Sequence, residues 1–179
     1  MNRKIGVFLS SHAAVADCYH VAAKRLGEWI GKNGDTLVYG GARKGLMEVL
    51  AQSTKQSGGR VYGVVPQILV ERNLVSDTID VNFHCCDLND RKAILIRESD
   101  ILIAFPGGVG TLDELFTILA ANAIGLEHKP VGLFHGDGCW DSLLALLKDL
   151  AERGFVSAEK TESLHVVTDE SELEEFLQP

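Results

Sequence analysis

The stretch Phe105-Pro106-Gly107-Gly108-Val109-Gly110-Thr111-Leu112-Asp113-Glu114 lies between an apolar run, Ile101 to Phe105, and a run with helical spacing, Leu112 to Ile124. This order predicts a buried strand that Pro106 ends, then a glycine turn, then a helix. Glycine lets a ligand approach the main chain closely, and the first amides of a helix have no intrahelical partner. The stretch therefore predicts an anion site that suits a phosphate.

The same residues allow a second interpretation, in which Thr111 and Glu114 only start the helix. Their Thr-x-x-Glu spacing is that of a capping box, in which each side chain bonds to the other residue's amide. A cap needs none of the glycines at 107, 108 and 110, so this interpretation leaves them unexplained. The stretch matches neither the G-x-G-x-x-G fingerprint nor a P-loop, and a generic NAD or ATP site is not predicted.

Length and charge limit the classes of protein to consider. The 179 residues, of which 46% are hydrophobic, suffice for one compact domain over residues 1–179. Lys and Arg number 17 against 25 Asp and Glu, so we expect no nucleic-acid partner and no attraction to anionic lipid. No apolar run reaches the ~20 residues of a membrane helix. The run from Ile5 to Leu9 is also too short for a signal h-region.

The four cysteines, Cys18, Cys85, Cys86 and Cys139, have no disulfide-framework spacing. His84 precedes Cys85, but no second ligand pair at C-x-x-C or H-x-x-H spacing accompanies it. We therefore expect a reduced chain in the cytoplasm, with no metal site and no cofactor.

Short apolar runs alternate with helical patterns along the whole chain. The expected strands are residues 5–9, 36–39, 61–65, 79–83, 101–105, 131–134 and 164–167. The expected helices are residues 15–32, 45–57, 87–98, 112–124, 143–150 and 170–177. Residues 67–78 have no clean period, and we expect a mobile segment over the site. The alternation predicts an α/β fold: a Rossmann-like, doubly wound parallel sheet with helices on both faces.

Ligands of such sheets bind beyond the carboxyl ends of the strands. Three segments follow expected strands directly and should gather at that edge: Ser10-Ser11, Gly40-Gly41 and the glycine turn. The candidate substrate-binding residues from these segments are Ser11, Gly40, Gly41, Gly107, Gly108, Val109, Gly110 and Thr111.

Arg91 lies three or four residues from Leu88, Ile94 and Leu95, inside the apolar stripe of the expected helix 87–98. A guanidinium in that position needs an anionic partner, and its planar, permanently charged fork suits a phosphate. The alternatives are a snorkelling side chain and an ion pair with an acidic neighbour.

With these residues in view, the chain resembles the LOG family of cytokinin riboside 5'-monophosphate phosphoribohydrolases, often labelled possible lysine decarboxylases. The family's PGGxGTxxE motif is matched by Pro106 through Glu114, and Arg91-Lys92 precedes it at the usual interval. Supporting matches are Tyr19-x-x-x-Ala23-x-x-Leu26-Gly27, Leu37-Val38-Tyr39-Gly40-Gly41, Gly45-Leu46-Met47 and Lys129-Pro130-Val131-Gly132-Leu133.

The resemblance implies hydrolysis of the N-glycosidic bond of AMP or an N6-modified AMP to the free base and ribose 5-phosphate. It implies Arg91 and Glu114 as catalytic residues, and Lys92 and the loop Gly107–Thr111 as substrate-binding residues. A carboxylate near the ribose would stabilise the oxocarbenium-like transition state of such a cleavage. A pyridoxal-dependent decarboxylase is not indicated, because the sequence shows no Schiff-base lysine with its partners. The alternative is a non-catalytic nucleotide-binding sensor or scaffold.

The resemblance also implies a homodimer with its sites near the subunit interface. The apolar spacing of Leu112, Leu115, Phe116 and Leu119 exceeds what one sheet face needs, which agrees with a homodimer.

Four positions depart from the usual family pattern. Ala42 and Glu48 replace glycines, and Asn122 stands where many plant members have Trp. Asn73, a further candidate substrate-binding residue, stands at an often acidic position. These departures leave the phosphate end intact and the preferred base open.

Overall fold

The structure is a computed structural model that describes residues 2–156 and 164–178. Its sheet has the strands β1 (Lys4–Phe8), β2 (Thr36–Tyr39), β3 (Arg60–Pro66), β4 (Val81–Cys85), β5 (Ile101–Ala104), β6 (Val131–Phe134) and β7 (Leu164–Val167). The strand order is β4-β3-β2-β1-β5-β6-β7, and every neighbouring pair is parallel. The chain thus winds outward from β1 to one edge and from β5 to the other, which confirms the predicted doubly wound fold.

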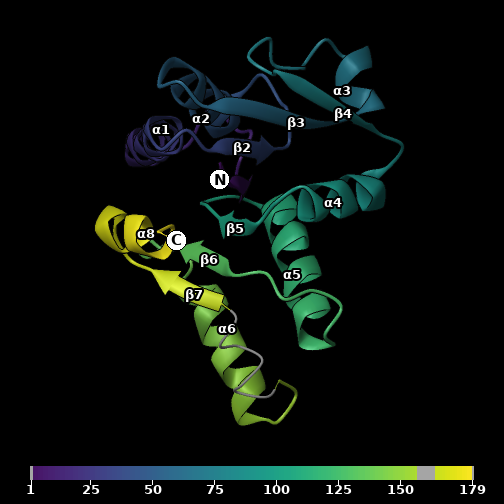
Figure 1. The fold of residues 1–179 in the computed structure, drawn as a ribbon. Helices are drawn as coiled ribbons and strands as arrows, with labels where there is room; N and C mark the ends of the chain where they lie inside the picture. The colour runs from purple at the N-terminus through teal and green to yellow at the C-terminus, as the bar shows by residue number, and fades with distance from the viewer. Residues whose placement is uncertain (1, 157–163, 179) are drawn as a thin grey trace.

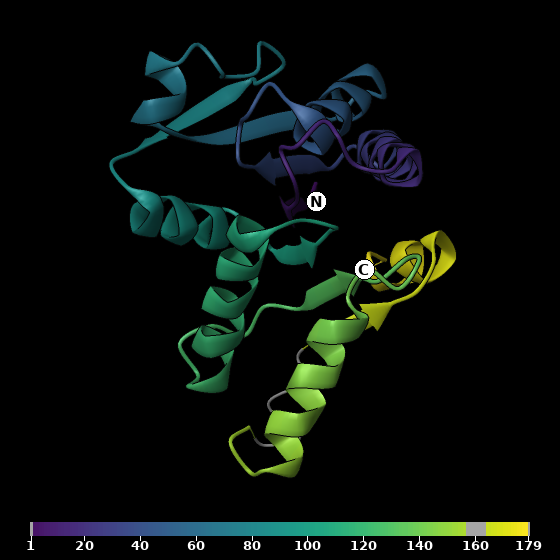
Figure 2. The same ribbon diagram turned by 180° about the vertical axis from the view of Figure 1, so that it is seen from behind.

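Helices cover both faces of this sheet (Figures 1 and 2). They are α1 (Asp17–Lys32), α2 (Gly45–Gln56), α3 (Gln67–Glu71), α4 (Leu88–Arg97), α5 (Val109–Ala123), α6 (Asp141–Glu152) and α8 (Glu170–Phe176). Two separate hydrophobic clusters result: α1, α2 and α8 contribute to one, and α4, α5 and α6 to the other. Successive residues of β5 alternate between them, with Ile101 and Ile103 in the first and Leu102 and Ala104 in the second. No helix in residues 2–156 or 164–178 is long and apolar enough to cross a membrane.

The segment 67–78 contains local structure that its sequence pattern does not predict. It begins with the short helix α3 and then runs beside the loop after β2. The Arg43 amide donates to the Leu74 carbonyl at 2.8 Å, and the Ser76 amide donates to the Gly41 carbonyl at 3.0 Å. These hydrogen bonds anchor the segment to the carboxyl end of β2. The fourth strand also begins two residues later than expected, at Val81.

Candidate functional site

The carboxyl ends of β1 and β5 meet at the point where the strand order reverses. The Phe105 amide donates to the Phe8 carbonyl at 2.8 Å, and the Ser10 amide donates to the Pro106 carbonyl at 3.2 Å. These two hydrogen bonds hold the start of the glycine turn beside Ser10. The predicted convergence of the two strand ends is therefore observed.

The helix after the glycine turn begins at Val109, with Gly108 at its N-cap position. No side chain caps it, and the Leu112 amide donates to the Gly108 carbonyl at 3.1 Å. Thr111 and Glu114 both lie inside the helix, so the capping-box interpretation is wrong. The helix starts earlier than expected because Gly108 takes the N-cap position and Val109 and Gly110 already belong to its first turn. Its first amides are left without side-chain partners, as an anion site requires.

The glycines of this turn differ in what surrounds them. A Cβ on Gly107 would lie 2.0 Å from Thr111 Oγ1, so the fold itself excludes a side chain there. A Cβ on Gly108 or Gly110 would meet no atom within 4 Å. The packing of this chain therefore leaves space beside the main chain at these two positions.

Arg91 pairs with Glu114, so of the interpretations of its position the ion pair with an acidic neighbour is the one observed. Arg91 Nη1 donates to Glu114 Oε1 at 2.5 Å, and only 13% and 6% of the two side chains are exposed. Arg91 Nε also donates to the Val64 carbonyl at 3.3 Å. The pair joins α4 to the second turn of α5 at the floor of the site.

Gly40, at the end of β2, makes room for this pair. A Cβ at that position would lie 1.9 Å from Arg91 Nη2. At the far end, Asp87 fixes the start of α4 by accepting from the amides of Asn89 and Asp90, each at 2.8 Å. The guanidinium is thus positioned by its own helix and by a neighbouring strand.

Burial sets the acidity of Glu114. Loss of water raises the pKa of this carboxyl, and the positive charge of Arg91 opposes that rise. A carboxyl with a raised pKa beside a fixed cation can hold or accept a proton nearer to neutral pH than an exposed glutamate.

A cleft of about 490 Å³ opens above the pair. Of the predicted residues it brings together Arg91, Glu114, Ser11, Gly40 and the segment Gly108–Thr111. Its other lining residues are Leu9, Ser10, His12, Ala42, Met47, Pro66, Ile68, Leu69 and Leu88. The cleft therefore has a polar end at the start of α5 and an apolar wall made by the loop after β2, the end of β3, and the helices α2, α3 and α4.

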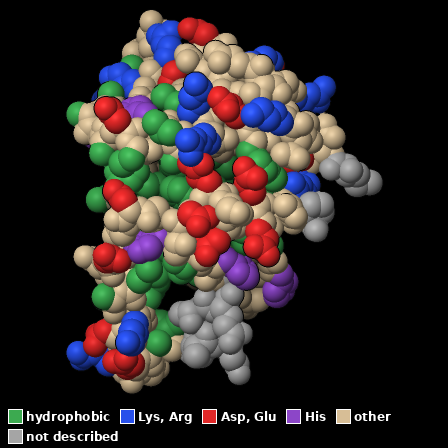
Figure 3. All heavy atoms as spheres, turned by 90° about the vertical axis from the view of Figure 1, so that its left-hand side faces the viewer, with side chains coloured by type: hydrophobic (Ala, Val, Ile, Leu, Met, Phe, Trp, Pro, Cys, Tyr) green, Lys and Arg blue, Asp and Glu red, His purple; other side chains and the backbone are tan. Residues whose placement is uncertain are grey.

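Local amides, rather than net charge, suit the cleft to an anion. The chain carries a formal charge of −8, and Figure 3 shows Asp and Glu side chains interspersed with Lys and Arg over one face. An anionic ligand would be met by the α5 terminus and by the guanidinium of Arg91.

Four predicted site residues do not line this cleft. Lys92 Nζ lies 2.8 Å from Asp113 Oδ1, in a pair between α4 and α5 that does not line the cleft. Gly41 has a φ of +76° and its hydrogen faces Val65, while the Asn73 carbonyl accepts from Arg43 at 2.8 Å. Gly107 lines a neighbouring cavity instead.

The residues that sequence reasoning missed are mainly apolar. Met47, Ile68, Leu69 and Leu88 come from three different helices, and no local motif joins them. Leu88 is the most informative, because it is 62% exposed although it lies in the predicted apolar stripe. An apolar side chain left in water beside a charged pair is a signal that only the structure gives.

The positions that depart from the usual pattern have separate roles. Ala42 lines the cleft, whereas the Glu48 carboxylate accepts from Gln52 Nε2 at 2.9 Å, away from the cleft. Asn122 Nδ2 donates to the Lys129 carbonyl at 2.9 Å and so shapes the loop before β6.

Comparisons with known proteins give matches over most of the chain. The family model described as possible lysine decarboxylase matches residues 47–177. A probable cytokinin riboside 5'-monophosphate phosphoribohydrolase from Oryza sativa subsp. japonica is 41% identical over 155 residues, which are 87% of this chain and 63% of that protein. A cytokinin riboside 5'-monophosphate phosphoribohydrolase from Arabidopsis thaliana is 33% identical over 176 residues, 98% of this chain and 76% of that protein. The chain thus spans less than two thirds of the rice relative.

Solved structures share the fold. The molybdenum cofactor carrier protein from Chlamydomonas reinhardtii has a TM-score of 0.74 and 25% identity, and the match covers 99% of both chains. DNA processing protein A from Streptococcus pneumoniae has a TM-score of 0.61 at 16% identity, covering 97% of this chain and 61% of that chain. The second match shows the fold alone.

Proposed function

The chain belongs to the LOG family, whose model is described as possible lysine decarboxylase, and on that premise we propose that it is a nucleoside 5'-monophosphate phosphoribohydrolase. Its curated relatives are named for hydrolysis that releases a base from a riboside 5'-monophosphate. The observation that carries the proposal is the buried pair of Arg91 and Glu114, which lines the same cleft as the uncapped start of α5.

The 5'-phosphate binds at the start of α5. The amides of the first turn, from Val109 to Thr111, are the unpaired donors of this helix, and the helix dipole favours a negative charge there. Gly108 and Gly110 leave the main chain bare, so phosphate oxygens can approach the amides directly. The phosphate thereby fixes the position of the ribose relative to the catalytic pair.

The pair then acts on the bond between ribose C1' and the base nitrogen. That bond breaks, the base takes the electron pair and a proton, and the oxygen of water bonds to C1'. The Glu114 carboxylate stabilises the positive charge that develops on the ribose. Its raised pKa also suits it to take the proton of the attacking water. Arg91 holds the carboxylate in place.

The base occupies the apolar end of the cleft. Met47, Ile68, Leu69 and Leu88 offer a surface to a planar purine, and the same wall can bury an apolar substituent on N6. The substrate is therefore AMP or an N6-modified AMP.

A non-catalytic nucleotide-binding protein is the second candidate. The observation that favours it is the match to the Chlamydomonas carrier protein over 99% of both chains. A carrier needs the phosphate end of the cleft, but it does not need a carboxylate buried against a guanidinium. The presence of Arg91 and Glu114 together favours the hydrolase.

The protein assembles as a homodimer through α5 and its neighbours. Exposed apolar side chains lie at several positions along and after this helix, including Val109 at 84%, Phe116 at 39% and Ile124 at 72% exposure. Burial of such a row in a partner copy would stabilise the dimer. Light scattering should give twice the 19.4 kDa chain mass at micromolar concentration, and a monomer mass would contradict this assembly.

The test of the activity is chromatography after incubation with AMP, an N6-modified AMP and adenosine. We expect free base and ribose 5-phosphate from a monophosphate, and far slower cleavage of adenosine, because the nucleoside lacks the group that the α5 terminus binds. Equal cleavage of AMP and adenosine would contradict the phosphate assignment. Tight binding of AMP without any cleavage would favour the non-catalytic candidate.

A further inference from the structure

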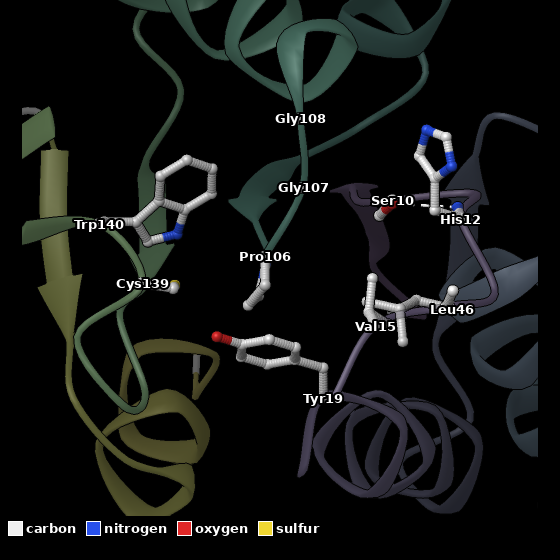
Figure 4. Close-up of a pocket in the computed structure, with 11 residues that line it drawn as sticks. Ser10, His12, Val15, Tyr19, Leu46, Pro106, Gly107, Gly108, Cys139 and Trp140 are labelled. Atoms are coloured by element: carbon white, nitrogen blue, oxygen red, sulfur yellow. Dashed lines mark hydrogen bonds between the residues drawn. The ribbon is translucent and has the colours of Figure 1, made fainter. Parts of the chain in front are cut away.

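A second cavity, of about 380 Å³, lies on the other side of the glycine turn (Figure 4). Its walls come from the loop after β1, from α1, from Pro106 and Gly107, and from the loop between β6 and α6. It shares Ser10, His12 and Gly108 with the catalytic cleft, so the two spaces adjoin at the start of α5. Its volume lies within the range of about 300 to 1,000 Å³ of small-molecule pockets.

Trp140 gives this cavity a hydrogen-bond donor without a partner. The residue is 5% exposed, and its Nε1 is buried with no hydrogen-bond partner among the described residues. Figure 4 shows the nitrogen edge of the indole turned toward the space beside Pro106 and Tyr19. Leaving a buried donor unpaired is unfavourable, so an acceptor is expected in the cavity.

The other polar side chains at this end already have partners. Tyr19 Oη donates to the Asp137 carboxylate, at 2.9 and 3.1 Å to its two oxygens, and Cys139 Sγ donates to the His135 carbonyl at 3.2 Å. Burial, with the help of Asp137, raises the pKa of Tyr19 to about 12, and burial raises that of Cys139 to about 12. Both groups therefore keep their protons at neutral pH, and both protons are already donated in hydrogen bonds within the protein.

The lining also defines the charge and shape of an occupant. None of the described residues that line the cavity is Lys, Arg, Asp or Glu, so an anionic group would find no countercharge inside. The rings of Tyr19, Trp140 and Pro106 present flat surfaces, and Val15 and Leu46 close the opposite wall. These surfaces suit an uncharged planar ring.

We propose that this cavity is a second binding site, for a neutral heteroaromatic ring whose ring nitrogen or carbonyl accepts a hydrogen bond from Trp140 Nε1. Two sources share this chemistry: a free base, and a ring joined through the 5'-phosphate held at Gly108, where the cavity meets the cleft. The position of that phosphate rests on the proposed function. The ring site itself depends on no turnover, so its test can fail while hydrolysis stands.

Fluorescence can report occupancy of the site. The chain has two tryptophans, so Trp29→Phe leaves Trp140 as the single tryptophan. Glu114→Gln in the same protein suppresses hydrolysis. This protein is titrated with adenine, with adenine in saturating AMP, and with a 5',5'-diadenosine diphosphate. We expect a saturable change in Trp140 emission. Survival of the adenine response in AMP identifies a free base, whereas a response to the dinucleotide alone identifies a ring joined to the phosphate.

Calorimetry with Trp140→Phe then tests the hydrogen bond. This substitution keeps an aromatic ring and removes the N–H donor, and Trp29→Phe is the matched control far from the cavity. Both variants are checked by thermal unfolding. We expect affinity for the responding ligand to fall about tenfold in Trp140→Phe only, which equals about 1.4 kcal/mol. Unchanged affinity in a folded Trp140→Phe, or no saturable emission change with either ligand, would overturn the second site.

Discussion

Two strand-glycine-helix junctions, one after β2 and one after β5, look alike in the sequence and differ in what their glycines do. At the first, the fold demands them: a Cβ on Gly40 would strike Arg91 Nη2 at 1.9 Å, and Gly41 has a φ of +76°. At the second, Gly108 has a φ of −105°, and neither it nor Gly110 has any atom within 4 Å of an added Cβ.

The first pair of glycines is required by the packing of the protein itself, whereas the second pair leaves space for a ligand. At Gly108 and Gly110 no neighbouring atom of the protein excludes a side chain. The absence of a side chain there is explained by a ligand that approaches the main chain from outside. In the proposed function, the junction after β2 therefore serves catalysis indirectly, through the position of Arg91. The junction after β5 would serve it directly, by binding the phosphate.

The largest expected effect comes from removing the side chain of Arg91, for which Gly40 makes room. Arg91→Ala leaves Glu114 buried without a countercharge, so we expect turnover to be lost and stability to fall by about 3 kcal/mol at pH 8. Without Arg91 the pKa of Glu114 rises further, and the folded state then holds its proton more tightly than the unfolded state. Stability should therefore decline as pH rises above the ordinary glutamate pKa of about 4.3.

Chemical denaturation of Arg91→Ala at pH 5 and pH 8 measures this effect. The destabilisation should be smaller at pH 5, where Glu114 can protonate at little cost. In the double variant Arg91→Ala with Glu114→Gln the difference should vanish, since no carboxyl remains to titrate. An equal loss at both pH values in the single variant would show that the buried charge is not its cause.

A smaller effect is expected from Gly40→Ala. The new methyl group must displace the guanidinium, and a shift of about 1 Å in a catalytic group can cost on the order of a hundredfold in rate. Steady-state kinetics should show a fall mainly in kcat, with AMP binding largely kept. A variant with wild-type kinetics would mean that Arg91 tolerates displacement, and the role assigned to Gly40 would be wrong.

Gly110→Ala and Gly108→Ala should act on binding and leave the fold intact. Both added methyl groups have room, and alanine inside the first turn of α5 should raise stability by up to about 1 kcal/mol at position 110. The methyl groups obstruct the approach of a phosphate, so KM for AMP should rise about tenfold. Thermal unfolding and kinetics of the same samples test this prediction. Lower stability with unchanged KM would mean that these glycines are required by the fold and not by a ligand.

The smallest effect is expected at Lys92. Its pair with Asp113 lies at 2.8 Å outside the cleft. The Lys92 side chain is 14% exposed, but Asp113 is half exposed and can be solvated without its partner, so Lys92→Ala should cost about 1–2 kcal/mol of stability. KM should change less than about threefold, as in the matched variant Asp113→Ala. A tenfold rise in KM for Lys92→Ala alone would instead support the sequence-based prediction that Lys92 binds substrate.

Some of this arrangement can be predicted from the sequence because it is encoded locally. The apolar runs and glycine turns predict the parallel sheet. Arg91 inside an apolar stripe indicates an anionic partner, and the structure gives the acidic neighbour that is the alternative to a phosphate. The start of α5 is mispredicted because glycines are poor helix formers, and here Gly108 is the N-cap and Gly110 lies in the first turn, neither with a positive φ. A Thr-x-x-Glu spacing read from position 111 therefore resembles a cap that does not exist.

The apolar wall cannot be predicted in the same way. Met47, Ile68 and Leu88 belong to three helices, and only the winding of the chain brings them to one cleft. Asn73 shows the opposite case, because it is expected from the sequence to bind substrate and does not line the cleft. Its φ of +53° and its bond to Arg43 shape the turn after α3.

Glu114→Gln tests the central claim most directly, because glutamine keeps the shape of the side chain and can still accept from Arg91. In one experiment, AMP binding is measured by calorimetry and release of adenine by chromatography, with wild type beside the variant. We expect the variant to fold and to bind AMP, with turnover reduced on the order of a hundredfold or more, or roughly 3 kcal/mol of barrier. Release of adenine by Glu114→Gln at near the wild-type rate would contradict the assignment of this carboxylate to catalysis.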